Sequence, residues 1–196
     1  MHAEILDGMV SGSEPPYHPN MSEQWGSKEY FLENLATDRA AYNWYLYELV
    51  RRTEPKIVVE LGTLLGGSCI CMLQGLPATS EIYTLDLTVY PQDCLFRLED
   101  PRLHRLCADT TNPSTPKKWV GSAHIDFLYI DTNHTYEQLS KEWGIWSPYL
   151  ASRALVAFDD IHVNSGMSKF WEELQYEKVE DSNLHHSGFG AIQYVK

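Results

Sequence analysis

Acidic residues stand at the ends of several short apolar runs in this chain. The runs cover 56–61, 81–87, 125–130 and 154–158, and the acids at their ends are Glu60, Asp86, Asp131, Asp159 and Asp160. In an open α/β sheet the carboxyl ends of parallel strands converge on one crevice, where nucleotide-like cofactors bind. The spacing therefore predicts a ligand site lined by carboxylates.

A glycine-rich turn follows the first of these runs. It contains Gly62, Gly66 and Gly67 and continues into Ser68. Glycine lets the backbone approach a ligand closely, although the same residues also suit an ordinary strand-to-helix turn. Because Asp86 follows at the next strand end, we interpret the turn as part of a cofactor site. The pattern is not Gly-x-Gly-x-x-Gly, which makes a nicotinamide dinucleotide less favoured.

Helical and strand patterns alternate along most of the chain. Apolar residues recur at helical spacing over 29–52, 68–74, 136–150 and 169–176, and strand-like runs separate these segments. This alternation predicts an α/β fold: a single doubly wound, Rossmann-like, mostly parallel sheet with helices on both faces. At the end of the chain, a turn-rich segment at 181–188 precedes one short strand at 190–195. We expect that strand to form an antiparallel C-terminal edge.

Length and composition indicate one domain with an N-terminal extension. The chain has 196 residues and is 43% hydrophobic, which is enough for a sizeable core. Residues 1–28 are rich in Gly, Pro, Ser and Asn, and we interpret them as an arm or lid. Residues 29–196 form the predicted ligand-binding domain.

Charge and cysteine usage argue against several functional classes. The formal net charge is −12 and no Lys/Arg cluster exists, so we expect neither nucleic acid nor an anionic membrane as a partner. No apolar run reaches the roughly 18 residues of a membrane-spanning helix, and the first residues are not the basic start of a signal peptide. Cys69, Cys71, Cys94 and Cys107 lack zinc-site spacing. We therefore expect reduced thiols in a cytoplasmic protein.

The motifs resemble those of class I S-adenosylmethionine-dependent methyltransferases. The matching pieces are V-E-L-G-T at 59–63 with G-G-S at 66–68, I-D-T-N-H-T-Y-E at 130–137, W-S-P-Y-L at 146–150, F-D-D-I-H at 158–162 and the segment 165–174. More narrowly, the chain is similar to metal-dependent sugar and macrolide O-methyltransferases and to cephalosporin-hydroxylase-like proteins. It departs from many of these at 151–154, where A-S-R-A replaces a turn with two glycines.

The resemblance implies roles in binding S-adenosylmethionine. The residues implied at or near the cofactor are Glu60, Gly62, Thr63, Gly66, Ser68, Asp86, Asp109, Thr110 and Asp131. Glu60, Gly62 and Thr63 would hold the methionine end. Asp86 would accept hydrogen bonds from the ribose hydroxyls, and Asp109 with Thr110 would lie beside the adenine.

The resemblance also implies a catalytic centre. Asp131, Asp159 and Asp160 match positions that hold Mg²⁺ or Mn²⁺, and hard cations prefer oxygen ligands. His134 matches a general base, and its ordinary pKa near 6.5 suits accepting a hydroxyl proton; His134 and Asp131 are the predicted catalytic residues. The alternatives are that the acids cap helices or face solvent, that His134 is an ordinary loop histidine, and that His162 is the base.

These residues together predict an enzyme, an S-adenosylmethionine-dependent O-methyltransferase. Its expected acceptor is a hydroxyl of a small polyhydroxylated, sugar-like molecule, with assistance from Mg²⁺. One alternative is a non-catalytic S-adenosylmethionine-binding protein of the same fold, and another is a nicotinamide-dependent Rossmann enzyme. The sequence leaves open whether the chain forms a homo-oligomer.

Overall fold

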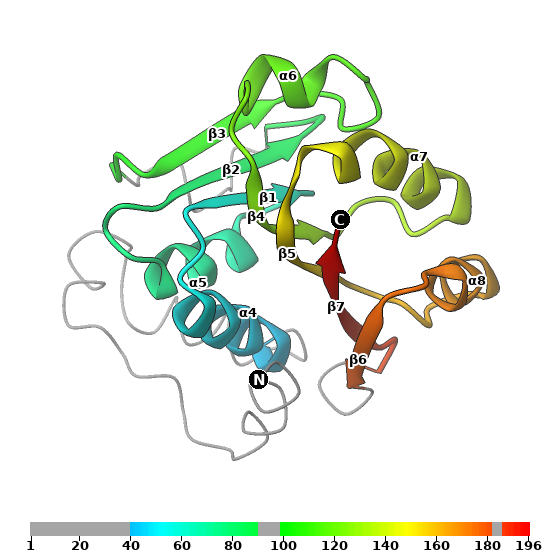
Figure 1. Ribbon diagram of the computed structural model, residues 1–196. Coiled ribbons are helices and arrows are strands. Elements are labelled where there is room, and N and C mark those ends of the chain that lie inside the picture. The colour runs from blue at the N-terminus through cyan, green and yellow to red at the C-terminus, as the bar shows by residue number, and fades with distance from the viewer. Residues whose placement is uncertain (1–39, 90–98, 182–185) are drawn as a thin grey trace.

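A computed structural model describes residues 40–89, 99–181 and 186–196 of the chain (Figure 1). The predicted arm or lid at 1–28 and the first part of the predicted helix at 29–52 lie outside the described residues. No helix within the described part is long and apolar enough to cross a membrane.

A seven-stranded sheet forms the centre of the molecule, in the order β3-β2-β1-β4-β5-β7-β6. Its strands are β1 (Ile57–Leu61), β2 (Glu81–Asp86), β3 (Leu103–Cys107), β4 (Ile125–Ile130), β5 (Leu150–Phe158), β6 (Glu177–Asp181) and β7 (Phe189–Val195). Strands β3, β2, β1, β4 and β5 pair in parallel, whereas β7 pairs antiparallel with both β5 and β6. The doubly wound, mostly parallel sheet predicted from the sequence is confirmed.

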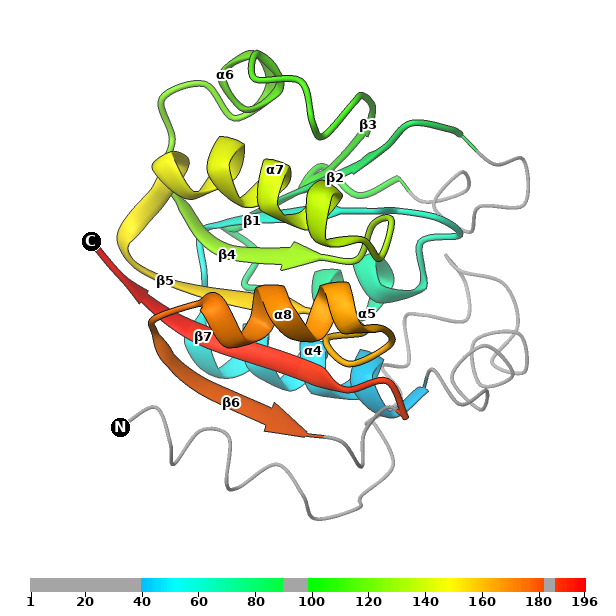
Figure 2. The ribbon, with the colours of Figure 1, turned by 90° about the vertical axis from the view of Figure 1, so that its right-hand side faces the viewer.

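Helices cover both faces of this sheet (Figure 2). They are α4 (Ala40–Thr53), α5 (Gly67–Gly75), α6 (Thr115–Trp119), α7 (Tyr136–Trp146) and α8 (Ser165–Glu173), with a short 3-10 helix, η2 (Ser147–Tyr149). Side chains alternate between the faces of a strand, so Val58 packs with the α4 and α5 residues while Val59 packs with those of α7 and α8. Two hydrophobic cores result, one on each face.

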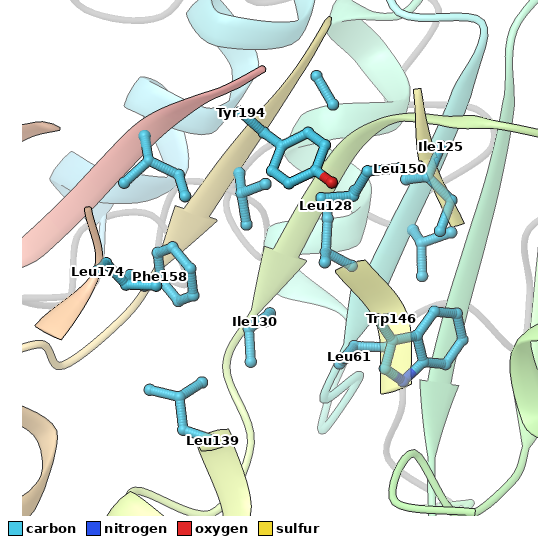
Figure 3. Packing of buried hydrophobic residues seen from close by; sticks show 14 of the residues in the cluster. Leu61, Ile125, Leu128, Ile130, Leu139, Trp146, Leu150, Phe158, Leu174 and Tyr194 are labelled. Carbon is cyan, nitrogen blue, oxygen red and sulfur yellow. The ribbon is translucent and has the colours of Figure 1, made fainter. Parts of the chain in front are cut away.

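The core under α7 and α8 contains the larger aromatic side chains (Figure 3). Trp146 of α7 and Phe158 of β5 are fully buried, and Tyr194 of β7 packs in the same cluster. Phe158 also contacts Trp171 of α8, with ring centroids 5.9 Å apart. These contacts pack α7 and α8 against the sheet along the length of β5, from Tyr194 opposite Ala154 to Phe158 at its end.

The predicted antiparallel pairing of the last strand is confirmed, whereas its predicted place at the edge of the sheet is wrong. Strand β7 is not at the edge, because it lies between β5 and β6, and β6 is a strand that the sequence reading missed. β7 reads F-G-A-I-Q-Y-V and is almost wholly buried, which suits an interior strand. β6 reads E-K-V-E-D, and charged side chains are typical of edges because they discourage pairing with another chain.

Candidate functional site

The predicted convergence of strand ends is confirmed. The backbone N–H of Gly62 donates to Leu85 O at 2.8 Å, and that of Asp131 donates to Leu61 O at 2.9 Å. The N–H of Asp159 donates to Ile130 O at 3.1 Å. The loops after β2, β1, β4 and β5 therefore start side by side along one edge of the sheet, and they bring the predicted acids to that edge.

Gly62 packs directly against the end of β4. Its φ is +100°, a conformation that residues with a side chain rarely adopt. A Cβ atom added at Gly62 would lie 1.8 Å from the carbonyl oxygen of Asp131. The glycine is therefore required by the contact between the β1 and β4 loops, whatever ligand binds beside it.

Glu60 lies inside the protein below this turn and is fully buried. Its two carboxylate oxygens accept hydrogen bonds from Ser68 at the start of α5 and from Thr84 of β2. Thr84 also shares a hydrogen bond with Thr63, with the two oxygens 2.6 Å apart. Burial raises the pKa of Glu60 to about 8. The Glu60 side chain thus connects the start of α5 to β2 beneath the glycine turn. Its contact with the cofactor stays a prediction.

Asp86 joins the loops after β1 and β2. One carboxylate oxygen accepts from the N–H of Leu64 at 2.8 Å and the other from the N–H of Thr88 at 3.1 Å. Leu64 is held at φ 45°, in the left-handed region. Asp86 stays partly exposed, and a carboxylate oxygen has more than one lone pair. Asp86 therefore has free acceptor capacity at the end of β2, and its contact with a ribose stays a prediction.

Asp109 and Thr110 occupy the loop between β3 and α6 but have different surroundings. Asp109 is exposed and accepts hydrogen bonds from the N–H and hydroxyl of Thr111. Thr110 is buried, and its hydroxyl donates to Glu142 of α7 at 2.5 Å. Asp109 is therefore open to solvent while the side chain of Thr110 faces the interior, and the place of both beside an adenine stays a prediction.

His134 lies between two of the predicted acids. Its Nε2 is 3.3 Å from Asp131 Oδ1, and its Nδ1 is 3.0 Å from Asp160 Oδ2. Hydrogen bonds with Asp131 and with Asp160 raise the pKa of His134 to about 10, against the opposing effect of burial. The imidazole is therefore protonated at neutral pH in this arrangement, and it keeps 32% of its side chain exposed.

Asp159 and Asp160 follow β5, and both are buried. The chain turns between them because Asp160 adopts φ 54°, which brings its carboxylate to His134. Asp160 also accepts a hydrogen bond from Ser187, a residue of the connection between β6 and β7. Burial, followed by the charges of Asp131 and Asp160, raises the pKa of Asp159.

The three predicted metal ligands, Asp131, Asp159 and Asp160, are not arranged around a common point. Within residues 40–89, 99–181 and 186–196, no group of three or more His, Cys, Asp or Glu side chains is placed so that it could hold a metal ion. Carboxylates are suitable donors for Mg²⁺, but the His134 ring stands between Asp131 and Asp160. The residue types fit a hard cation, whereas their placement does not, so Mg²⁺ at these acids stays a prediction.

His162, the alternative base, has other neighbours. Its Nδ1 is 3.3 Å from Ser168 Oγ, and its Nε2 is 3.4 Å from Glu180 Oε2. These partners belong to α8 and β6 and not to the acids at the ends of β4 and β5. The geometry therefore favours His134 over His162 for a role at the predicted catalytic centre.

Four residues of the site region were not singled out from the sequence: Thr84, Thr132, Glu142 and Ser187. Each contributes through a side-chain partner in a distant segment. Only Ser187 carries a local signal, because it precedes Gly188, whose φ of +82° marks a turn before β7. The others look like ordinary strand, loop and helix residues.

Comparison with known proteins agrees with this architecture. A family described as a methyltransferase domain matches residues 59–161. An uncharacterized protein, y4gI, of Sinorhizobium fredii is 26% identical over 166 residues; the match covers 76% of this chain but 18% of that protein. The chain thus spans less than a fifth of the length of that curated relative.

Two solved structures share the fold. An O-methyltransferase from Bacillus cereus in complex with SAH has a TM-score of 0.63 at 20% identity, covering 90% of this chain and 96% of its own. The O-methyltransferase TomG from Streptomyces achromogenes, involved in tomaymycin synthesis and solved with SAM, has a TM-score of 0.64 at 14% identity, covering 100% and 96%. Because the family model matches more than half of the chain and spans the strand ends described above, this chain belongs to the methyltransferase domain family.

Proposed function

We propose that this chain is an S-adenosylmethionine-dependent O-methyltransferase that acts on a hydroxyl group of a small polyhydroxylated molecule. One observation supports this most strongly. The turn at Gly62 lies in direct contact with Asp131, and the His134 ring lies between Asp131 and Asp160. A cofactor held at the first loop would therefore lie next to a group able to handle a proton.

The ends of β1, β2 and β3 carry hydrogen-bond acceptors that suit S-adenosylmethionine. When bound, this cofactor supplies a methyl group on a positively charged sulfur. Asp86 would accept from the ribose hydroxyls, as it already accepts from Leu64 and Thr88. The exposed carboxylate of Asp109 would lie at the adenine end. Gly62, Thr63, Gly66 and Ser68 would shape the turn for the methionine part.

The acid-and-histidine side would handle the acceptor. As the hydroxyl oxygen forms its bond to the methyl carbon, the carbon–sulfur bond breaks and the hydroxyl proton must leave. Neutral His134 would take that proton, and Asp131 and Asp160 would stabilise the imidazolium that forms. Because the pKa of His134 is raised to about 10, the neutral form is a minority at pH 7.

The charge of the site supports a neutral, hydroxyl-rich acceptor. The carboxylates of Asp131 and Asp160 flank His134 in a chain with net charge −12. Carboxylates accept hydrogen bonds from hydroxyl groups but repel anionic groups such as phosphates. A sugar-like acceptor therefore suits the site better than a phosphorylated one.

The proposal also includes assistance by Mg²⁺ or Mn²⁺ bound at Asp131, Asp159 and Asp160. A cation there requires the His134 ring to move from between Asp131 and Asp160. No nucleic acid or membrane is proposed as a partner. The proposal places the protein in the cytoplasm and allows it to form a homo-oligomer.

A labelled-methyl assay tests the proposal. The protein is incubated with S-adenosylmethionine carrying a labelled methyl group and a panel of neutral diols and sugars, in EDTA and then in excess Mg²⁺. Label in the acceptor supports an O-methyltransferase, and a requirement for Mg²⁺ supports the cation. SAH binding without transfer to any acceptor favours the non-catalytic alternative. A melting temperature raised by NADH and not by SAH favours the nicotinamide-dependent alternative.

A further inference from the structure

Glu142 is a buried carboxylate that the proposed reaction does not use. It lies on α7 and is fully buried. Its Oε1 accepts from Thr110 Oγ1 at 2.5 Å and from Gln138 Nε2 at 2.8 Å, and its Oε2 accepts from Thr132 Oγ1 at 2.7 Å. Thr110 lies in the loop after β3, at the proposed adenine end, and Thr132 lies in the loop after β4, at the proposed site of methyl transfer.

The first loop lies at the proposed adenine end. Thr110 follows Asp109 directly, and its backbone oxygen accepts from Trp146 Nε1 of the same helix at 2.9 Å. The hydroxyl of Thr115 closes the loop by donating to Asp109 O at 2.7 Å. Helix α7 therefore holds this loop at two points, one on the side chain and one on the backbone of Thr110.

The second loop lies at the proposed transfer centre. Thr132 follows Asp131 directly, and its hydroxyl donates to Oε2 of Glu142. Asp131 in turn contacts the turn at Gly62 and the ring of His134. A substitution of Thr132 would therefore displace Asp131 and His134, which lie at the proposed site of methyl transfer.

We infer that Glu142 is a positioning residue that fixes the loop after β3 to the loop after β4, so that cofactor binding and the placement of Asp131 and His134 depend on one carboxylate. This inference rests on the proposed function. A carboxylate suits the task because both of its oxygens only accept hydrogen bonds, whereas an amide presents a donor on one side. Burying a carboxylate is costly unless it is hydrogen-bonded, and helix packing alone would be served by an apolar residue.

The test compares SAH binding by calorimetry in matched variants. Glu142→Gln keeps the size of the side chain but turns one acceptor into a donor, and we expect the Kd for SAH to rise about tenfold. Glu172→Gln makes the same chemical change at an exposed position of α8 and is expected to leave the Kd unchanged. An E142Q protein with wild-type affinity overturns the inference.

Thr132→Val distinguishes positioning from local packing. Thr132 lies outside the adenine loop, yet the inference predicts that T132V raises the Kd for SAH several-fold in the wild-type background. In the E142Q background, T132V should add little, because the connection is already broken. Equal effects in both backgrounds would show that Thr132 acts independently of Glu142 and would overturn the inference.

Two further measurements keep the outcome decisive. If E142Q does not fold, the cycle of Thr110→Val, Thr132→Val and the double variant replaces it, and additive effects on the Kd count against Glu142. If the wild type binds no SAH, the proposed function fails, and amide exchange then decides the inference alone. T110V should accelerate exchange in residues 131–134 if the loops are coupled through Glu142, and unchanged exchange there overturns the coupling.

Discussion

The two halves of the site edge are built in different ways. The half at the ends of β1 and β2 is held by backbone geometry, with Gly62 in close contact and Asp86 accepting from two backbone N–H groups. The half at the ends of β4 and β5 is held by side-chain charges, with His134 between Asp131 and Asp160. The contact between Gly62 and the β4 loop contains no titratable group, whereas the contacts of His134 depend on charge. We therefore expect protonation to affect the half at β4 and β5 more strongly than the half at β1 and β2.

The largest effect is expected at the charged half. His134→Ala should lower turnover by about 10²–10⁴-fold if His134 accepts the hydroxyl proton, while leaving SAH affinity nearly unchanged. Steady-state kinetics with labelled cofactor, together with calorimetry, measure both quantities. Wild-type turnover in H134A would remove the functional contrast between the two halves.

The pH profile of turnover sharpens the same contrast. Only neutral imidazole accepts a proton, and the pKa of His134 is raised to about 10, so the rate should increase with pH through the neutral range and beyond. Asp160→Asn removes one of the two partners that raise this pKa. The increase should therefore move to lower pH in D160N, and a profile that D160N does not shift would contradict the assignment of His134.

Gly62→Ala should break the contact that joins the two halves. The new Cβ would lie 1.8 Å from Asp131 O, at a φ of +100°, so backbone must move. We expect a loss of about 2–4 kcal/mol in the free energy of unfolding, measured by urea denaturation. Gly121→Ala provides the control, because its φ is +69° but a Cβ there meets nothing within 4 Å. Equal losses in both variants would mean that conformational strain alone, and not the contact with Asp131, sets the cost.

Asp86→Ala tests the backbone-held half. The variant loses the carboxylate that joins Leu64 and Thr88 and that is proposed to bind the ribose. SAH affinity should fall about 10–100-fold, because hydrogen bonds to a charged acceptor contribute about 1.5–3 kcal/mol each. Asp126→Ala is a control at the opposite, amino-terminal end of the strands, where Asp126 accepts from the backbone N–H groups of Lys56 and Ile57. Calorimetry showing unchanged affinity in D86A would reject Asp86 as a cofactor ligand.

The smallest effect concerns Glu60 and the dependence of stability on pH. Its pKa is raised from 4.5 to about 8 in the folded protein, so between these values the folded state binds more protons than the unfolded state. The free energy of unfolding therefore falls as the pH rises from about 4.5 to 8. Glu60→Gln removes this contribution, so the free energy of unfolding should fall less between pH 5 and pH 8 than it does in the wild type. Parallel stability curves for the two proteins would show that Glu60 stays ionised in the folded state.

The sequence was most informative where the signal is local. Alternating apolar runs predicted the parallel strands, and the acid at the end of each run predicted the edge to which Asp86, Asp131 and Asp159 converge. The order of the last two strands was not predictable in this way. Strand β6 is short and charged, so its period is weak, and only its pairing with β7 makes it a strand.

By itself, the sequence determined the fold class, the glycine turn and the positions of the acids, because each depends on residues that are neighbours in the chain. Only the tertiary structure decided that His134 lies between Asp131 and Asp160, that Ser187 reaches Asp160, and that Glu142 joins two loops. These contacts link segments up to 32 residues apart, as in the bond between Thr110 and Glu142. Side chains so far apart in sequence meet only in the folded sheet, where hydrogen bonds raise the pKa of His134 and burial raises that of Asp159.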